Sequence, residues 1–151
     1  MGILSDIVGW LLANRRERVV DEREVTKSLA SELDALAELM SDLLEATDGA
    51  GQIRDEVLPD LERRRERVWT RWISILGTDG YATRDPGLQA EIEECIKICH
   101  AAPGVYVEEL YLVQIGATEG CVPKDIVDQF ARSIDRIRDL TARMRIDAED
   151  R

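Results

Sequence analysis

The chain has 151 residues and a formal net charge of −11, with 31 acidic side chains against 20 basic ones. This length predicts one domain, and the acidic balance disfavours nucleic acid as a partner because the average surface repels phosphate. A composition of 44% hydrophobic, 34% charged and only 5% aromatic residues is typical of a helical domain and excludes a disordered chain.

The first fourteen residues are the most apolar part of the chain. On a helix, one broad face would hold Ile3, Leu4, Ile7, Val8, Trp10, Leu11 and Leu12, and three arginines follow directly. This apolar run would rise only about 15 to 18 Å, roughly half the hydrocarbon core of a bilayer, so it is too short to span one. It is not typical of a signal peptide either, since no cation precedes it and Asp6 interrupts it.

The boundary after this run has two interpretations. Asn14 and Glu17 have the spacing of a capping box, which favours a new helix there, whereas one unbroken helix from Ile3 onward is the alternative. We divide the chain into an amphipathic N-terminal helix, residues 1–14, and a helical bundle domain, residues 15–151.

Two apolar stripes with three-four spacing follow. The first predicts a helix to about Ala46 through Val25, Leu29, Leu33, Leu36, Met40, Leu43 and Leu44. A turn at residues 48–51 should end it, with Gly49 in the left-handed conformation. The second stripe ends at Gly77 and contains Ile53, Val57, Leu61, Val68, Trp72 and Ile75 or Leu76. Pro59 either kinks this second helix or starts its main body.

The second half of the sequence predicts further helices. Asp85 and Pro86 are the expected N-cap and first residue of one helix, which Pro103 and Gly104 should end. Its inward residues would be Leu88, Ile92, Cys95, Ile96 and Cys99. Residues 105–115 suit a strand or a helix, and we choose a helix because a lone strand would have no pairing partner. Pro123 opens a last helix that frays into a charged tail at residues 147–151.

These elements predict an all-α fold, an antiparallel bundle of four to five helices with an apolar N-terminal helix.

No residue pattern indicates catalysis. The chain has one histidine, His100, and no phosphate-binding glycine loop or nucleophile elbow, so we expect no enzyme, no catalytic residue and no cofactor. Four side chains have the chemistry of zinc ligands, namely Cys95, Cys99, His100 and Cys121. On a helix His100 would point about 100 degrees away from Cys99, so we favour core packing of the cysteines and assign no metal.

A basic strip on the second stripe's helix is the one feature that suggests nucleic acid. Arg63, Arg67 and Arg71 are spaced by four, but Glu62 and Glu66 lie between them. We therefore expect a solvated helix face that pairs with acidic neighbours, and no nucleic-acid partner.

The apolar arc of the N-terminal segment spans roughly 200 degrees, which is more than one neighbouring helix covers. The sequence therefore predicts a non-enzymatic helical module for protein–protein interaction or oligomerisation, with a protein partner or a second copy. The alternative is a small membrane-acting or membrane-associating helical-bundle effector. Three cysteines, an odd number, favour the cytoplasm, with membrane association if the alternative holds. The expected interface residues are Ile3, Leu4, Ile7, Val8, Trp10, Leu11, Leu12, Arg15 and Arg16.

Overall fold

The computed structural model describes the backbone of residues 2–150 and the side chains of residues 6, 7, 9, 10, 22–97 and 104–150. Over this part the chain is helical, which confirms the all-α prediction. It contains α1 (Gly2–Leu44), the 3-10 helix η1 (Asp55–Asp60), α2 (Leu61–Leu76), α3 (Pro86–Gln114) and α4 (Lys124–Glu149). Isolated β-bridges join Thr47 to Ile53 and Gln52 to Cys121, which ties the loop after α1 to the loop before α4.

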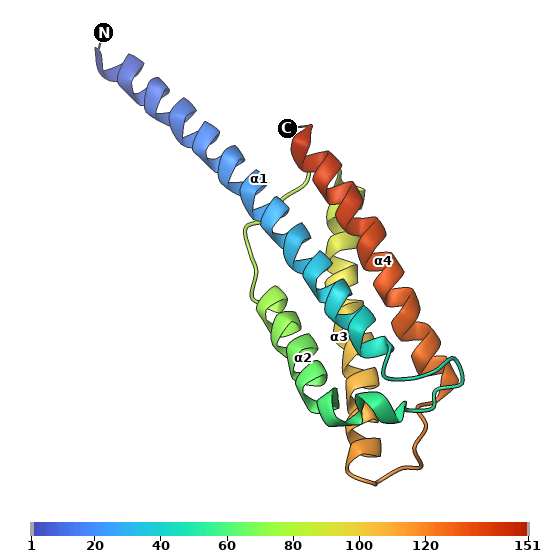
Figure 1. Cartoon of the computed structure of the whole chain (residues 1–151). Coiled ribbons are helices and arrows are strands. Elements are labelled where there is room, and N and C mark those ends of the chain that lie inside the picture. Colours follow the sequence, from blue (N-terminus) through green and yellow to red (C-terminus); the bar gives the residue numbers. More distant parts are fainter. Residues whose placement is uncertain (1, 151) are drawn as a thin grey trace.

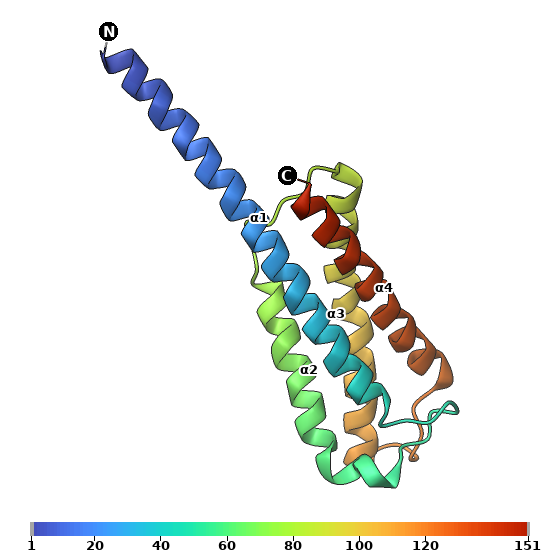
Figure 2. The same ribbon diagram turned by 45° about the horizontal axis from the view of Figure 1, so that its top comes forward.

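Helix α1 is a single element of 43 residues that runs through residues 14 and 15 without interruption. Of the two interpretations of the sequence, the unbroken helix is the one that forms. Its N-terminal part extends beyond the ends of the other helices (Figure 1), and the turned view in Figure 2 shows the same projection. The first buried side chain along the described part of α1 is that of Thr26.

The core lies between the C-terminal half of α1 and the other three α-helices. Helix α1 contacts α2 and α4, and α3 contacts the same two helices from the opposite side. Each helix contributes fully buried apolar side chains, among them Leu33, Leu36, Met40, Ile75, Ile92, Leu110, Phe130 and Ile137. These residues follow the apolar stripes of the sequence, as expected for helices that bury one face.

The turn after α1 differs from the sequence prediction. Gly51, and not Gly49, has the left-handed conformation, with φ at 86°. The carboxylate of Asp48 accepts a hydrogen bond from the backbone N–H of Gln52 at 2.9 Å. Gly51 lies in this turn, directly against the backbone of Val122. The N–H of Val122 donates to the carbonyl of Gly51 at 2.7 Å. A tertiary contact therefore decides which glycine adopts the special backbone.

Helix α3 begins as predicted but does not end where predicted. The Asp85 carboxylate caps it by accepting from the N–H of Gly87 at 2.9 Å, and Pro86 opens it. The helix then passes through residues 103 and 104 to Gln114, so the predicted stop at Pro103 and Gly104 is wrong. An interior proline costs about 3 kcal/mol, and burial of the side chains that follow outweighs this cost. Those buried side chains are Tyr106 and Leu110.

The C-terminal segment is helical, so the predicted fraying from residue 147 is also wrong. Helix α4 continues to Glu149, and Ala148 is buried. The backbone N–H of Arg84 donates to the Asp147 carboxylate at 3.1 Å. The guanidinium of Arg84 donates to the backbone carbonyl of Asp150 at 2.6 Å. The charged tail therefore has partners in the loop before α3.

Candidate functional site

Two of the nine residues predicted to form an interface have described side chains, and both are exposed. Ile7 is 49% exposed and Trp10 is 62% exposed, on the projecting part of α1. The other seven lie outside the described side chains, namely Ile3, Leu4, Val8, Leu11, Leu12, Arg15 and Arg16. Trp10, a large aromatic side chain on the projecting part of α1, is the more exposed of the two.

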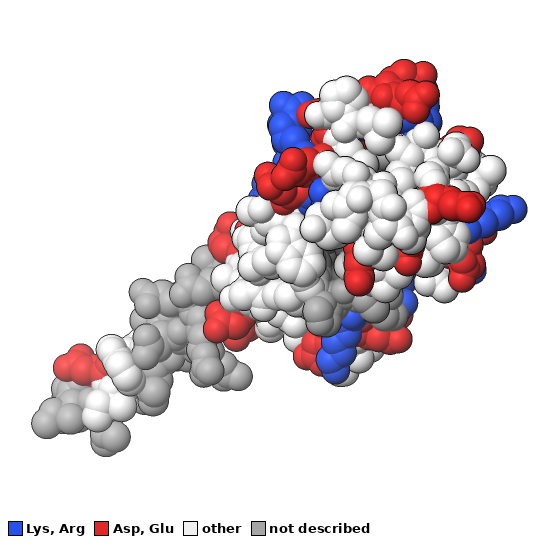
Figure 3. All heavy atoms as spheres, turned by 90° about the horizontal axis from the view of Figure 1, so that it is seen from below, with Lys and Arg blue, Asp and Glu red and all other residues white. Residues whose placement is uncertain are grey.

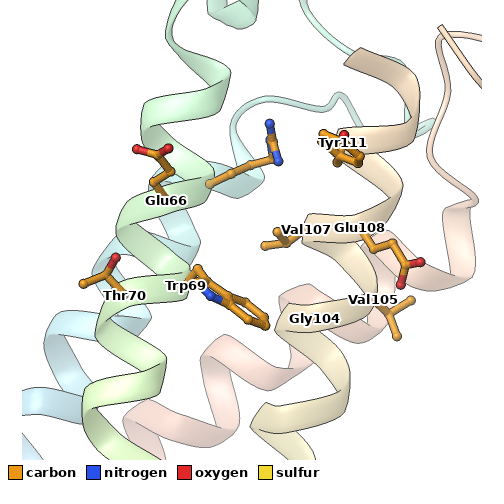
Figure 4. Close-up of a pocket in the computed structure, with 9 residues that line it drawn as sticks. Glu66, Trp69, Thr70, Gly104, Val105, Val107, Glu108 and Tyr111 are labelled. Atoms are coloured by element: carbon orange, nitrogen blue, oxygen red, sulfur yellow. The ribbon is translucent and has the colours of Figure 1, made fainter. Parts of the chain in front are cut away.

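The structure adds a second surface, which we call the α2/α3 groove. It is a hollow of about 780 Å³ that opens between these helices and is lined by nine residues. Figure 4 shows Trp69 reaching from α2 toward α3 beside Gly104, with Val105 and Tyr111 on the α3 side. Gly104 carries no side chain, and nothing lies within 4 Å of where its Cβ would be, so the groove is open to solvent at this point of α3.

The sequence of α2 explains why Trp69 faces outward. Val68, Trp72 and Ile75 are buried, while Trp69, Ile73 and Leu76 are each one position further along and are exposed. The second set shares its own face of the helix because its members are also spaced by three and four. Helix α2 thus has more apolar side chains than the core covers, and the surplus faces outward. Trp69 is the member of this second stripe that lines the groove, so the stripe indicates an exposed apolar face of α2 but not the groove itself, and sequence reasoning missed that face.

Aromatic and charged side chains close one end of the groove. The guanidinium of Arg65 lies over the ring of Tyr111, 5.1 Å from its centroid, and Arg65 also donates to the side-chain carbonyl of Gln114. A cation placed this way over an aromatic face contributes about 0.5 to 1 kcal/mol at an exposed site. At the centre of the groove, the Trp69 ring packs on the Trp72 ring with centroids 5.2 Å apart. The exposed tryptophan is therefore held by a buried one.

Arg63 of the basic strip and the adjacent Arg64 pair with acidic side chains. Arg63 forms an ion pair with Asp60 at 2.7 Å, and Arg64 forms one with Asp42 at 3.2 Å. The hydrogen bond from Arg63 is the largest cause that lowers the pKa of Asp60 below its ordinary value. In the face seen in Figure 3, charges of both signs are interspersed.

The cysteines are not brought together in the described part of the chain. Cys95 is buried in the core, as predicted, and Cys121 is exposed in the loop before α4. The other two candidate ligands, Cys99 and His100, lie outside the described side chains. Among the residues whose side chains are described, no group of three His, Cys, Asp or Glu is arranged to hold a metal ion.

Within the described residues, no helix combines the length and hydropathy needed to cross a membrane.

Comparisons with protein-family models, with curated proteins and with solved structures find no match. The function of the two exposed surfaces therefore has to be inferred from their own chemistry.

Proposed function

We propose that this protein is a non-enzymatic helical interaction module that forms homo-oligomers through the projecting part of α1. The observation that carries this proposal is the exposure of Ile7 and Trp10 on a helix whose described buried residues begin only at Thr26. Large apolar side chains that share an exposed helical face are typical of interfaces, and Trp is among the residues most enriched at their energetic centres. A protein surface is thus the environment that best suits this segment.

We further propose that the four α-helices form an antiparallel bundle that serves as a rigid base for the projecting part. Two findings support this arrangement: each helix contacts two of the others, and successive helices alternate in direction in Figure 1. A rigid base matters for binding because a helix that is already ordered loses less conformational entropy when it meets a partner.

Burial of the exposed residues supplies part of the free energy that association needs. A Trp side chain has about 200 Å² of surface, and apolar burial contributes roughly 25 cal/mol per Å², so Trp10 together with its aliphatic neighbours offers several kcal/mol. Association of two chains costs about 4 to 15 kcal/mol in translational and rotational freedom. The segment therefore has to make contacts along its length, and the cytoplasm remains the predicted location.

The proposal is tested by measuring the solution mass of the full chain over a range of concentrations. We expect the wild type to form an oligomer and Trp10→Asp to be monomeric. Ile146→Asp is the matched control, because Ile146 is 61% exposed on α4 and lies outside both surfaces. A wild-type chain that stays monomeric, or a Trp10→Asp variant that associates like Ile146→Asp, contradicts the proposal.

A second candidate function is membrane association through the same segment. The exposed Trp10 is followed in the sequence by Arg15, Arg16 and Arg18, an order typical of helices that lie at a lipid interface. The acidic body opposes this role on anionic lipid because it is repelled by the surface. Co-sedimentation with vesicles of neutral and of anionic lipid separates the two functions. Binding of a monomeric wild type that is lost in Trp10→Asp would replace the first candidate by the second.

A further inference from the structure

Two apolar surfaces on this chain complement each other. One is the projecting segment, which we define as residues 2–14, and the other is the α2/α3 groove. We propose that the groove of one copy binds the projecting segment of a second copy, and that the exchange is reciprocal. This inference rests on the proposed function and names the site that the segment occupies. Docking of an amphipathic helix into an apolar groove is a common mode of recognition.

The projecting segment cannot reach the groove of its own chain. Helix α1 is continuous from Gly2 to Leu44, so folding back would require the helix to break. Its direction is also fixed where it leaves the core. The buried Thr26 hydroxyl lies 2.9 Å from the carbonyl of Ala82 and accepts from the N–H of Ala82 at 3.1 Å. These contacts join α1 to the loop between α2 and α3, so the segment is directed away from the body.

The dimensions of the groove suit part of the segment. At 1.5 Å per residue, the groove runs along about 8 Å of α2, from Arg65 to Thr70, and about 11 Å of α3, from Gly104 to Tyr111. The groove can therefore hold about two turns of a helix, the part of the segment that contains Ile7 and Trp10. Its apolar lining contains Trp69, Val105 and Tyr111, and the segment offers Ile7 and Trp10. Aromatic side chains on both partners are typical of contacts that carry most of the binding energy.

The charges favour this pairing over contact between two bodies. The projecting segment carries one charged side chain, Asp6, and three arginines and Glu17 follow it, so residues 1–20 have a net charge of +1 and residues 21–151 a net charge of −12. Two acidic bodies repel each other, whereas an almost uncharged segment followed by three arginines adds little repulsion when it meets an acidic body. The rims of the groove carry Arg65 on α2 and Glu108 on α3, so charges of both signs are available for the segment.

Reciprocal exchange also doubles the surface area that the two chains bury. One helix in one groove covers less than the standard interface of about 1,600 Å², whereas a two-fold symmetric exchange makes the same contact twice. The exchange is closed, because each chain gives one segment and receives one. A second copy is thus the occupant that covers both exposed surfaces at once.

The test combines a variant of the segment with a variant of the groove in the full chain. Trp10→Asp removes the occupant and Val105→Glu blocks the groove, and we expect each variant alone to be monomeric, with at least a tenfold loss in the dimerisation constant. An equimolar mixture of the two should recover a heterodimer, weaker than the wild-type dimer, because one intact segment then meets one intact groove. Leu58→Glu is the matched control, since Leu58 and Val105 are both 42% exposed and Leu58 does not line the groove.

The outcomes separate the groove from the proposed function. A dimeric wild type, a monomeric Trp10→Asp and a Val105→Glu that dimerises like Leu58→Glu overturn the groove and leave the proposed function standing. A wild type that is monomeric overturns both. If Val105→Glu fails to fold, a short thiol-reactive cross-linker provides the second measurement, in a Cys99→Ser, Cys121→Ser background that leaves the buried Cys95 as the one native thiol. Chains with Trp10→Cys and chains with Val105→Cys should join when mixed, and failure to join in a wild-type-like dimer overturns the groove.

Discussion

The hydroxyl groups of Tyr106 and Thr47 lie 3.0 Å apart in the interior and form a hydrogen bond that joins α3 to the loop after α1. The Tyr106 ring stacks on Phe130 of α4, with centroids 4.1 Å apart. One side chain therefore connects three parts of the chain, and it lies on the stretch of α3 that follows Pro103. This placement explains why the helix continues through the proline.

Tyr106→Phe should destabilise the fold only modestly. The ring keeps its stacking on Phe130, and the Thr47 hydroxyl keeps a hydrogen bond to the carbonyl of Leu44 at 3.2 Å, so no buried donor is left without a partner. We expect the free energy of unfolding to fall by about 1 kcal/mol, measured by urea denaturation. Tyr111→Phe is the control, because Tyr111 is exposed on the same helix and should be neutral. A loss above about 3 kcal/mol in Tyr106→Phe would contradict this account.

The protein should lose stability in alkaline solution through the same residue. Burial is the main cause that raises the pKa of Tyr106 from its ordinary value of 10.0 to about 12, against a smaller lowering by the hydrogen bond with Thr47. A group whose pKa is raised by folding stabilises the fold fully below its unfolded pKa and loses that contribution as pH rises through the folded value. The free energy of unfolding should thus decrease between pH 10 and 12, by about 2 to 3 kcal/mol from this group. The difference in free energy of unfolding between the wild type and Tyr106→Phe should shrink and then change sign over this range, and a difference that stays constant with pH would be inconsistent with it.

Gly51 and Gly49 provide a matched pair in one turn. Gly51 has φ at 86°, and a Cβ on it would overlap the backbone carbonyl of Val122, whereas a Cβ on Gly49 meets nothing within 4 Å. We expect Gly51→Ala to lower the melting temperature clearly, with a loss of about 2 kcal/mol or more. Gly49→Ala should be neutral or slightly stabilising, because it restricts only the unfolded chain. Equal effects of the two substitutions would show that the contact with Val122 does not constrain the turn.

The sequence predicted the helices better than it predicted where they end. Apolar spacing located the buried faces, as with Leu33 and Leu36 on α1 and Phe130 and Ile137 on α4, because this spacing follows directly from helical geometry. The errors at Gly49, Pro103 and residue 147 share one cause. At each point a contact with a residue distant in the sequence decides the local backbone, and no local pattern reports such a contact.

The same contrast applies to the candidate site. Ile7 and Trp10 are exposed, and the width of the apolar arc had marked both of them in the sequence, but their role in an interface stays a prediction. The α2/α3 groove depends on how two helices pack, and the single-stripe interpretation of α2 assigned Trp72 to the core without considering Trp69 and Ile73 as a second face. Packing between elements, and not the pattern within one element, creates that surface.

Thr26 should determine how firmly the projecting part of α1 is held. Its side chain is fully buried, accepts from the N–H of Ala82 at 3.1 Å and lies 2.7 Å from the carbonyl of Glu22. Thr26→Val keeps the shape of the side chain but removes the acceptor, which leaves the N–H of Ala82 without this partner at the edge of the core. We expect a loss of about 1 to 3 kcal/mol in the free energy of unfolding.

Thr26→Ser is the informative control, because it keeps the hydroxyl and removes only a methyl group, and it should retain most of the stability. Hydrogen exchange measured on both variants should show faster exchange at Ala82 in Thr26→Val alone, since that amide has lost its acceptor. If Thr26→Ser proves as destabilising as Thr26→Val, packing of the methyl group and not the hydrogen bond holds α1 at this point. The trajectory of the projecting segment would then depend on shape and not on the polar contact with the α2–α3 loop.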